Sequence, residues 1–503
     1  MERREQLLRQ VQEDPTALVD RLLELEAENA ELKRQLFGAK ADKLSAEQEQ
    51  QMAQVVGDLA EQIQRPPPMS SEIQEEENPS KPRPRRLRHP IPAHLETVTT
   101  VLEPAPEEKA CPRCGPKRRI GEEWSERIDL IPARLVRQVT VRPKYACHCG
   151  QCGVAIAPLP VSLIPQSRLG LGLAVFILLL RFDDHVAYYS LEKIFRERHE
   201  VIIPRQQMVQ WVEQIALLLL GLCQAMWEEM KRGGYLQIDE TPVKVLDPEI
   251  KGKAATGYLW FYSVPHGDVI VEFCSGRGQE APKKRLEGFQ GTIQSDAYDV
   301  YLCLERDLPG LRRHGCLAHS RRKFYQALRQ GQPEAIWFIG QMRQLYRIED
   351  RAREQTMSWT QRHALRVEQN ARALWEAMRK RAEELNPKLL PKSTLGKAVH
   401  YFLNEYQPLT RYLEGGQFEI DNNLVENAIR PSCVGKKRWL FLGHPQAGWR
   451  SAVIYSLIVS CRRRSINPQE YLTDVLSRLP SMKASEVKNL VPACWKPKST
   501  DTS

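Results

Sequence analysis

Three acidic side chains are spaced along this sequence in a way that would let them bind divalent metal ions. Asp239 ends the apolar run YLQID, and Asp296 ends a second such run, GTIQSD. If the two runs are neighbouring strands, their terminal carboxylates lie together at the rim of a sheet. Two like charges at that distance repel each other unless a cation lies between them. Carboxylate oxygens without a nearby histidine favour Mg²⁺ or Mn²⁺.

A third acid would complete a site for two metal ions about 4 Å apart, which stabilise the attacking and leaving oxygens of a phosphoryl displacement. The candidate is Glu426, in the segment FEIDNNLVENAIRP. Two alternatives remain open. The spacing Asn423-x-x-Glu426 is also that of a helix capping box, in which the glutamate reaches back to the first turn. Asp421 is either a turn residue or the next candidate for the third ligand.

The segment that follows Glu426 is strongly basic. From Asn427 to Gln469 the sequence contains no aspartate or glutamate. An acid-free basic stretch directly after an isolated glutamate suits a metal site that faces a phosphate backbone. The alternative is an ordinary solvated face. The residues predicted to contact DNA phosphates are Arg430, Lys436, Lys437 and Arg438.

Two groups of cysteines have the spacing of a zinc ribbon. The first is CPRCG at 111–115, and the second is CHCGQCG at 147–153. Two such tight turns can direct four thiolates at one tetrahedral zinc ion, which would be structural. The predicted ligands are Cys111, Cys114, Cys149 and Cys152, with Cys147 or His148 as an alternate ligand.

Two further patterns each allow two interpretations. Cys316 and His319 are three residues apart and can share one helix face. They are candidates for supporting the metal ligands or contacting DNA, and the alternative is an ordinary helix with a partly buried cysteine. The segment 190–215 has the pattern helix, proline-bounded turn, helix. It would either read DNA or pack on the sheet.

The elements that must position the acids follow from hydrophobic patterning. Strand-like runs cover 235–239, 258–264, 268–274 and 291–296, an order in which an antiparallel meander brings the first and last strands together. Helical periodicity covers about 170–232, 320–415 and 423–478. Leucines between Leu18 and Leu36 follow a heptad with Asn29 at one a position. This predicts a parallel two-stranded coiled coil, or alternatively a helix that packs on its own chain.

These patterns predict several regions in order along the chain. They are a helical, leucine-zipper-like coiled coil at 1–61, a Pro-rich basic linker at 62–107, a zinc-ribbon-like DNA-binding module at 108–160, a helical region at 165–232, a catalytic domain at 233–465 with a helical insertion at about 320–415, and a C-terminal tail at 466–503.

Composition points to a polyanionic partner. The 503 residues include 73 Lys and Arg against 63 Asp and Glu, a net charge of +10. The longest apolar stretch, near 169–180, has about 12 residues, short of the roughly 20 that span a membrane. The N-terminus MERREQLLRQ lacks the apolar core of a signal peptide. We therefore expect a cytoplasmic, nucleoid-associated protein that does not enter a membrane.

Several of these motifs together resemble one known family. The segments IDETPVKV, QSDAYDVY, GCLAHSRRKF, EIDNNLVENAIRPSCVGKKRWLF and CPRCG are similar to those of the DDE transposases of the insertion-sequence-66 family. The resemblance covers nearly the whole chain. It implies a multidomain α/β protein with a ribonuclease-H-like catalytic core, in which Asp239, Asp296 and Glu426 form the acidic triad that holds two Mg²⁺ or Mn²⁺ ions.

The resemblance also implies a function. A protein of this family would hydrolyse the 3′ ends of an insertion sequence and join them to target DNA. Its partners would be double-stranded DNA at the element ends and at the target, a second copy or more of itself, and accessory proteins. The alternatives are a structure-specific DNA nuclease of the same fold and a non-catalytic zinc-ribbon DNA-binding regulator.

Overall fold

The computed structural model describes residues 110–111, 115–116, 134–146, 154–158, 160–250 and 253–497. The chain divides into two units, one formed by residues 39–141 and the other containing residues 142–503. In the first unit, β1 (Ala110–Cys111) pairs antiparallel with β2 (Gly115–Pro116). In the second, β3 (Lys144–Ala146) pairs antiparallel with β4 (Val154–Ile156). The predicted coiled coil and Pro-rich linker lie outside the described residues.

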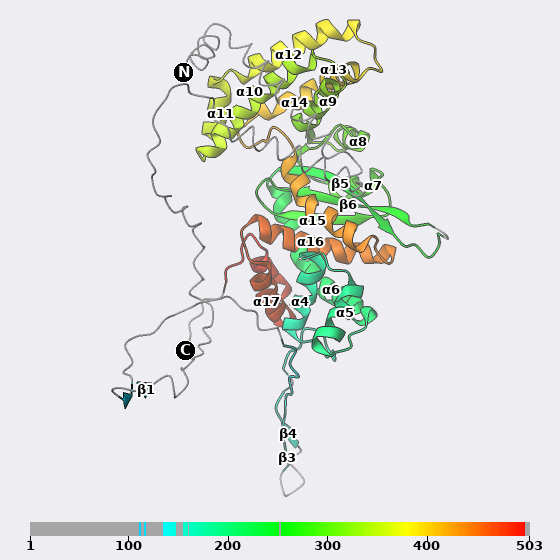
Figure 1. Cartoon of the computed structure of the whole chain (residues 1–503), viewed down its shortest axis with the longest axis vertical. Coiled ribbons are helices and arrows are strands. Elements are labelled where there is room, and N and C mark those ends of the chain that lie inside the picture. The colour runs from blue at the N-terminus through cyan, green and yellow to red at the C-terminus, as the bar shows by residue number, and fades with distance from the viewer. Residues whose placement is uncertain are drawn as a thin grey trace. The chain divides into compact units, whose positions relative to one another are not determined.

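The larger unit is built on a five-stranded mixed sheet with the order β7-β6-β5-β8-β9 (Figure 1). Strands β5 (Tyr235–Val245), β6 (Ala255–Ser263) and β7 (Val269–Cys274) are antiparallel neighbours. Strand β8 (Gly291–Gln294) runs parallel to β5, and β9 (Leu311–His314) runs parallel to β8. The last predicted strand therefore does lie beside the first. It reaches that place in parallel orientation, after the chain has crossed over through the short helix α7 (Glu280–Arg285).

Helices cover the sheet and its edges. Helix α15 (Asn423–Trp439) packs on β5 and β6, and α16 (Gly448–Arg463) packs on β7 (Figure 1). Most of α16 is buried, and its serines bond to the edge strand: the backbone N–H groups of Val269 and Val271 donate to Ser460 and Ser456. At the other edge, the N–H of Arg313 in β9 donates to the carboxylate of Glu305 in α8 (Asp299–Asp307). Both edge strands thus have partners outside the sheet.

The helices before the sheet are α4 (Leu171–Phe182), α5 (Tyr188–His199) and α6 (Arg205–Arg232). Helix α6 packs against α16, and α17 (Pro468–Arg478) packs against α4. Among the described residues, α6 is the one helix whose length and composition would allow it to cross a membrane. Many of its apolar residues, including Trp211 and Leu219, are buried in the protein, whereas Leu217 and Leu220 are exposed.

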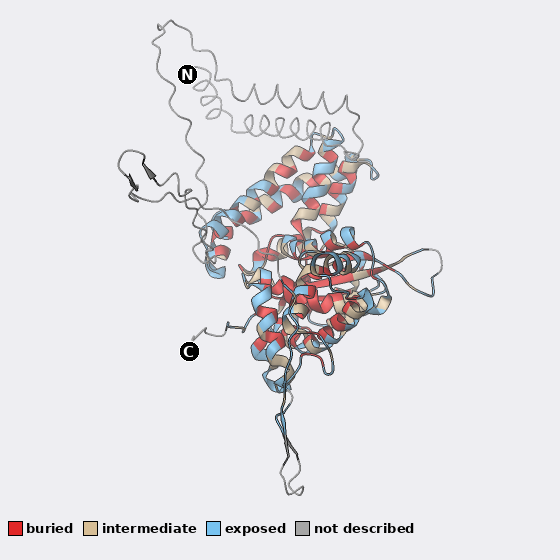
Figure 2. Cartoon of the chain, turned by 60° about the horizontal axis from the view of Figure 1, so that its bottom comes forward, coloured by how far each residue is buried: buried red, intermediate tan, exposed pale blue. Residues whose placement is uncertain are grey.

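A second hydrophobic core lies in the helices between β9 and α15. These are α9 (Leu317–Arg329), α10 (Ala335–Glu354), α11 (Trp359–Glu368), α12 (Ala371–Leu385), α13 (Thr394–Asn404) and α14 (Tyr406–Thr410). Trp375 stacks on Phe402, and Phe324 stacks on Phe338. Figure 2 shows buried residues along the inner faces of these helices and through the sheet. Short 3-10 helices cover Asn386–Lys388, Arg411–Glu414, Pro445–Ala447, Leu479–Ser481 and Ala484–Leu490.

Candidate active site

Two adjacent strands carry the first two predicted acids. Gln237 of β5 is the register partner of Gln294 of β8, and the strands are parallel. Asp239 and Asp296 each follow two residues later, Asp239 within β5 and Asp296 just after β8 ends. The two runs are neighbours, as the sequence predicted, but β5 continues to Val245, so the prediction that Asp239 ends its strand was wrong.

Asp239 lies in a partly buried region of concentrated negative charge. Burial, followed by the charges of Glu240, Asp296 and Glu426, raises the pKa of Asp239 to about 8. The backbone N–H of Glu240 donates to Asp239 Oδ1 at 2.8 Å and opposes this shift. Asp296 accepts a bond from the N–H of Tyr298 at 3.0 Å. Concentrated negative charge on hard oxygen donors fits a divalent ion such as Mg²⁺.

Glu426 lies in the first turns of α15 and faces two basic side chains of α9. Its carboxylate is 3.7 Å from His319 Nε2 and 3.8 Å from Arg322 Nη2. The helix begins after Asn422, which makes no side-chain capping bond, so the capping-box alternative is not what the structure shows. Within the described part of the chain, no three His, Cys, Asp or Glu side chains are close enough to share one metal ion. The charges of Asp296 and Glu426 raise the pKa of Asp239, but the three side chains do not converge on one point.

Cys316 and His319 connect α9 to the segment around Glu426. The Cys316 thiol is buried, and its sulfur accepts the N–H of Asn422 at 3.5 Å. Burial lowers the pKa of His319, although the charges of Asp296 and Glu426 act in the opposite direction. His319 Nδ1 is buried without a hydrogen-bond partner. The cysteine therefore holds the chain before α15, while the histidine lies beside its glutamate.

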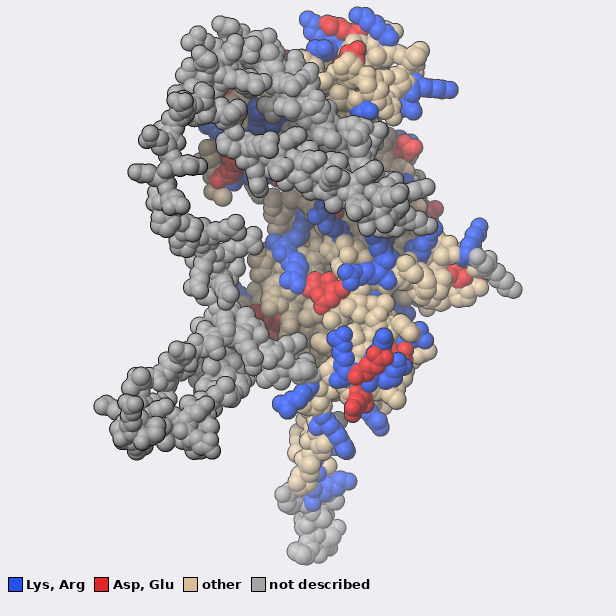
Figure 3. All heavy atoms as spheres, in the orientation of Figure 1, with Lys and Arg blue, Asp and Glu red and all other residues tan. Residues whose placement is uncertain are grey.

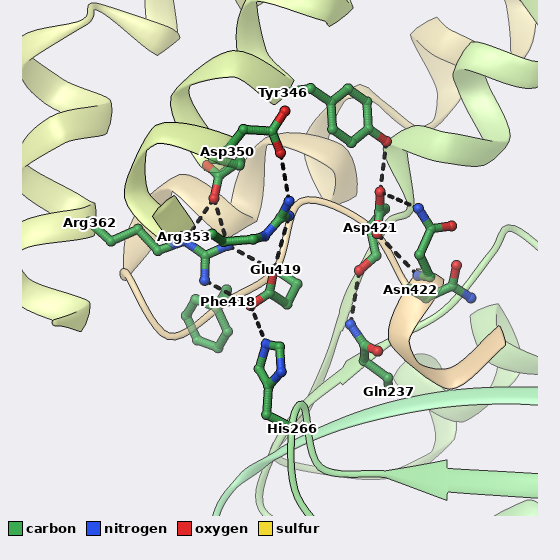
Figure 4. A network of polar contacts seen from close by, with 12 residues as sticks. Gln237, His266, Tyr346, Asp350, Arg353, Arg362, Phe418, Glu419, Asp421 and Asn422 are labelled. Atoms are coloured by element: carbon green, nitrogen blue, oxygen red, sulfur yellow. Dashed lines mark hydrogen bonds and ion pairs between the residues drawn. The ribbon is translucent and has the colours of Figure 1, made fainter. Parts of the chain in front are cut away.

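Asp421, the other candidate for a third ligand, is engaged elsewhere (Figure 4). The hydroxyl of Tyr346 in α10 donates to its Oδ2 at 2.8 Å, and Asn423 donates to both carboxylate oxygens. Burial, the largest cause, raises the pKa of Asp421. Its side chain serves the turn that leads into α15.

Glu240 is a neighbour of the site that sequence patterning missed. Its carboxylate accepts two bonds from Arg277, at 2.8 and 2.5 Å, and one from the Tyr301 hydroxyl at 2.6 Å. The Arg277 guanidinium in turn lies 3.9 Å from the centre of the Tyr298 ring. Alternation along β5 places Glu240 on the opposite face from Asp239. No local signal in the sequence pairs Glu240 with a residue 37 positions away.

The predicted phosphate contacts differ from one another in their surroundings. Lys436 donates to Thr241 Oγ1 at 2.6 Å and to the carbonyl of Pro242 at 2.8 Å, so its charge is bound to β5. By contrast, Lys437 and Arg438 are exposed at the end of α15. Figure 3 shows Lys and Arg side chains gathered around a small acidic group on one face of this unit.

A hollow lies beside the first turns of α15. It has a volume of about 500 Å³ and includes both Glu426 and the exposed Arg430 in its wall. The other lining residues are Asn423, Asn427, Ile429 and Cys433. An acid and a guanidinium on one wall offer oxygen for a cation and positive charge for a phosphate.

The structure describes little of the predicted zinc ligands. Cys111 lies in β1 as the register partner of Gly115 in β2, so the two ends of CPRCG are adjacent. The strands β3 and β4 likewise flank the second cysteine group. Cys114, Cys149 and Cys152 lie outside the described residues, as do the alternates Cys147 and His148.

Comparison with known families accounts for most of the chain. Residues 166–450 match the family described as "Transposase IS66 family", and residues 108–150 match the zinc-finger binding domain of transposase IS66. The second match includes Cys147 and ends before Cys152. Residues 456–493 match the IS66 C-terminal element, and residues 24–99 match a segment described as "Transposase C of IS166 homeodomain".

Similar proteins occur in Sinorhizobium fredii. The uncharacterized protein y4qI is 33% identical over 447 residues, which cover 85% of this chain and 81% of that protein. The uncharacterized protein y4jD is 30% identical over 513 residues and 97% of both chains. The family matches confirm the resemblance seen in the sequence, and they support DNA as a partner and zinc as a bound metal. The chain belongs to the IS66 transposase family.

Proposed function

We propose that this chain is the catalytic transposase of an insertion sequence, which hydrolyses the 3′ ends of the element and joins them to target DNA. The observation that carries the proposal is that Asp239 lies on β5 and Asp296 lies just after the adjacent parallel strand β8, with Glu426 within electrostatic reach on α15. The strand order β7-β6-β5-β8-β9, with three antiparallel strands followed by two parallel ones, supports a ribonuclease-H-like core.

In this proposal Asp239, Asp296 and Glu426 hold two Mg²⁺ or Mn²⁺ ions. Such ions, when bound, activate the attacking oxygen and neutralise charge on the phosphate. His319 and Arg322 steady the Glu426 carboxylate from the side of α9. The free cations on α15 bind neighbouring phosphates and keep the DNA in register. These cations are Arg430, Lys437 and Arg438.

The N-terminal part of the chain would organise the DNA complex. We assign structural zinc to Cys111, Cys114, Cys149 and Cys152, with Cys147 or His148 as the alternate ligand. The zinc ribbon would hold the element ends, and the coiled coil would pair two protomers across two ends. The complex would act on the nucleoid in the cytoplasm, with accessory proteins where the element encodes them.

The test compares Glu426→Gln with the unmodified protein on labelled DNA that carries the element's own ends. Glutamine keeps the shape of the side chain but removes the charge that a metal ion needs. We expect Mg²⁺-dependent nicking and joining to vanish in this variant, while DNA binding and the unfolding temperature persist. Asp421→Asn is the matched control, because it removes a nearby carboxylate whose hydrogen-bond donors are Tyr346 and Asn423.

Other outcomes separate the alternatives. Normal joining by Glu426→Gln contradicts its role as a ligand and moves the third acid elsewhere. Nicking without joining identifies a structure-specific nuclease. DNA binding without any cleavage, with the element's other proteins present, identifies a non-catalytic regulator.

A further inference from the structure

Two glutamines lie directly behind the aspartates of the proposed site. Gln237 precedes Asp239 by two residues and shares a face of β5 with it. Gln294 is the last residue of β8 and precedes Asp296 by two residues. Both side chains are 0% exposed. They are register partners on β5 and β8, and Gln237 Nε2 donates to Gln294 Oε1 at 2.9 Å.

Both glutamines also hold the segment that leads into α15, here called the 415–422 loop. Gln237 Nε2 donates to the carbonyl of Asp421 at 2.9 Å, and its Oε1 accepts the N–H of Val425 at 3.2 Å. Gln294 Nε2 donates to the carbonyl of Glu419 at 2.7 Å. Figure 4 shows the amide of Gln237 pointing at the backbone of Asp421. The two strands and the loop are therefore tied to one another by side-chain amides.

The amide of Gln294 makes two further hydrogen bonds. Its Nε2 also donates to the carbonyl of Gly315 at 3.1 Å, and its Oε1 accepts the hydroxyl of Tyr235 at 2.6 Å. The same hydroxyl accepts the N–H of Glu419 at 3.0 Å. Every donor of both amides is used, which is the condition for burying them without a desolvation penalty.

The chemistry of the contacts requires amides at both positions. A backbone N–H can only donate and a carbonyl can only accept, so Gln237 must present an oxygen to Val425 and an NH₂ group to Asp421. A carboxylate would lose the donors, and an apolar side chain would lose both. The same reasoning applies to Gln294, whose NH₂ group faces two carbonyls.

We propose that Gln237 and Gln294 are positioning residues. They fix the start of α15 beside β5 and the end of β8, and so set the position of Glu426 relative to the two aspartates. The inference rests on the proposed function, since it concerns the same acids. Val425 directly precedes Glu426, and Asp421 and Glu419 lie just before α15, so the amides hold the chain on the approach to the glutamate. Because each amide reaches the loop from a position two residues before one of the aspartates, a change in either amide alters the spacing among all three acids.

The experiment uses the full-length protein with Gln237→Met and Gln294→Met, which keep side-chain length and remove the amide. Ser456→Ala is the matched control, because it removes a buried hydrogen bond to β7 and leaves the 415–422 loop untouched. The first readout is hydrogen exchange of residues 419–427 without metal. The second is binding of Mn²⁺, measured by electron paramagnetic resonance, with Glu426→Gln alongside.

We expect exchange at 419–427 to become about tenfold faster in both glutamine variants and to stay unchanged in Ser456→Ala. Mn²⁺ affinity should fall by about 10- to 100-fold in the glutamine variants, as when the residues that orient metal ligands are removed. Equal exchange in the glutamine variants and the unmodified protein would overturn the inference, as would unchanged Mn²⁺ affinity despite faster exchange. If a methionine variant does not fold, Tyr235→Phe, which removes the hydroxyl between Gln294 and Glu419, is judged by the same criteria.

The two readouts separate this inference from the proposed function. If the unmodified protein binds no Mn²⁺, or binds it equally well with Glu426→Gln, the metal site fails. The exchange result still decides whether the glutamines hold α15 in place.

Discussion

Arg366 of α11 should contribute a large share of the stability of the helical region between β9 and α15. Its side chain is 1% exposed and makes five hydrogen bonds, as many as a guanidinium has donors. Two of them reach the Glu349 carboxylate, at 2.8 and 3.0 Å. The others reach the carbonyls of Tyr412, Gly415 and Phe418 at 2.7–2.9 Å. One side chain thus ties α11 to α10 and to the 415–422 loop.

Arg366→Met keeps most of the apolar stem and removes all five donors. Removing one partner of a buried ion pair costs about 3–5 kcal/mol, because the other charge stays buried. Glu349 retains Arg362, whose Nε donates to it at 2.7 Å, which moderates this cost. The three carbonyls increase the cost, because each loses its hydrogen bond from Arg366. We therefore expect the free energy of unfolding to fall by about 4 kcal/mol.

Urea denaturation followed by far-UV circular dichroism measures this change. The control is Arg379→Met on α12, whose ion pair with Glu383 is exposed, and it should change stability by no more than about 0.5 kcal/mol. A loss below about 1 kcal/mol for Arg366→Met would refute the reasoning, because it would mean that the buried bonds of Arg366 to Glu349 and to the three carbonyls stabilise the fold no more than an exposed ion pair does.

Two further predictions follow from the surroundings of charged groups. Burial, and then three neighbouring arginines, lower the pKa of His314 to about 3, so the native protein holds it neutral while the unfolded chain protonates it below pH 6.5. The free energy of unfolding should therefore fall by about 1.4 kcal/mol for each pH unit as pH falls from 6 towards 3. His314→Asn should show a flatter pH dependence in thermal unfolding. Neutralising Arg430, Lys437 and Arg438 together should reduce the magnitude of the negative slope of log K against log salt for DNA binding by about 2.7. Fluorescence anisotropy at several salt concentrations measures this slope. Lys436→Gln should leave that slope unchanged and reduce stability instead, and an equal effect on the slope would show that its bonds to β5 open in the DNA complex.

The strands of the five-stranded sheet were predictable where apolar residues alternate or run together. The predicted runs at 235–239, 258–264, 268–274 and 291–296 correspond to β5, β6, β7 and β8. Strand β9 was missed, because its sequence LRRH contains a buried arginine and a buried histidine in place of apolar residues. The parallel orientation of β8 depends on contacts across the sheet, which local periodicity does not report.

The acids of the site were recognisable by type and position, but their partners were not. Asp421 looked like an alternative ligand, since nothing nearby in sequence reveals the Tyr346 hydroxyl that binds it from 75 residues away. Gln237 and Gln294 carried no signal, because a glutamine within an apolar run usually indicates an exposed position. Their burial depends on carbonyl and N–H groups of a loop more than a hundred residues later. Interactions of this kind are fixed by the tertiary fold.

The closed edges of the sheet have a consequence for assembly. An exposed edge strand is a template on which another chain can add a strand of its own. Here the outward N–H groups of Val269 and Val271 are already taken by serines of α16, and that of Arg313 by Glu305. These three N–H groups are therefore not free to pair with the edge strand of another copy bound to the same DNA molecule. Any association between copies of this chain would therefore have to use surfaces other than these three edge positions.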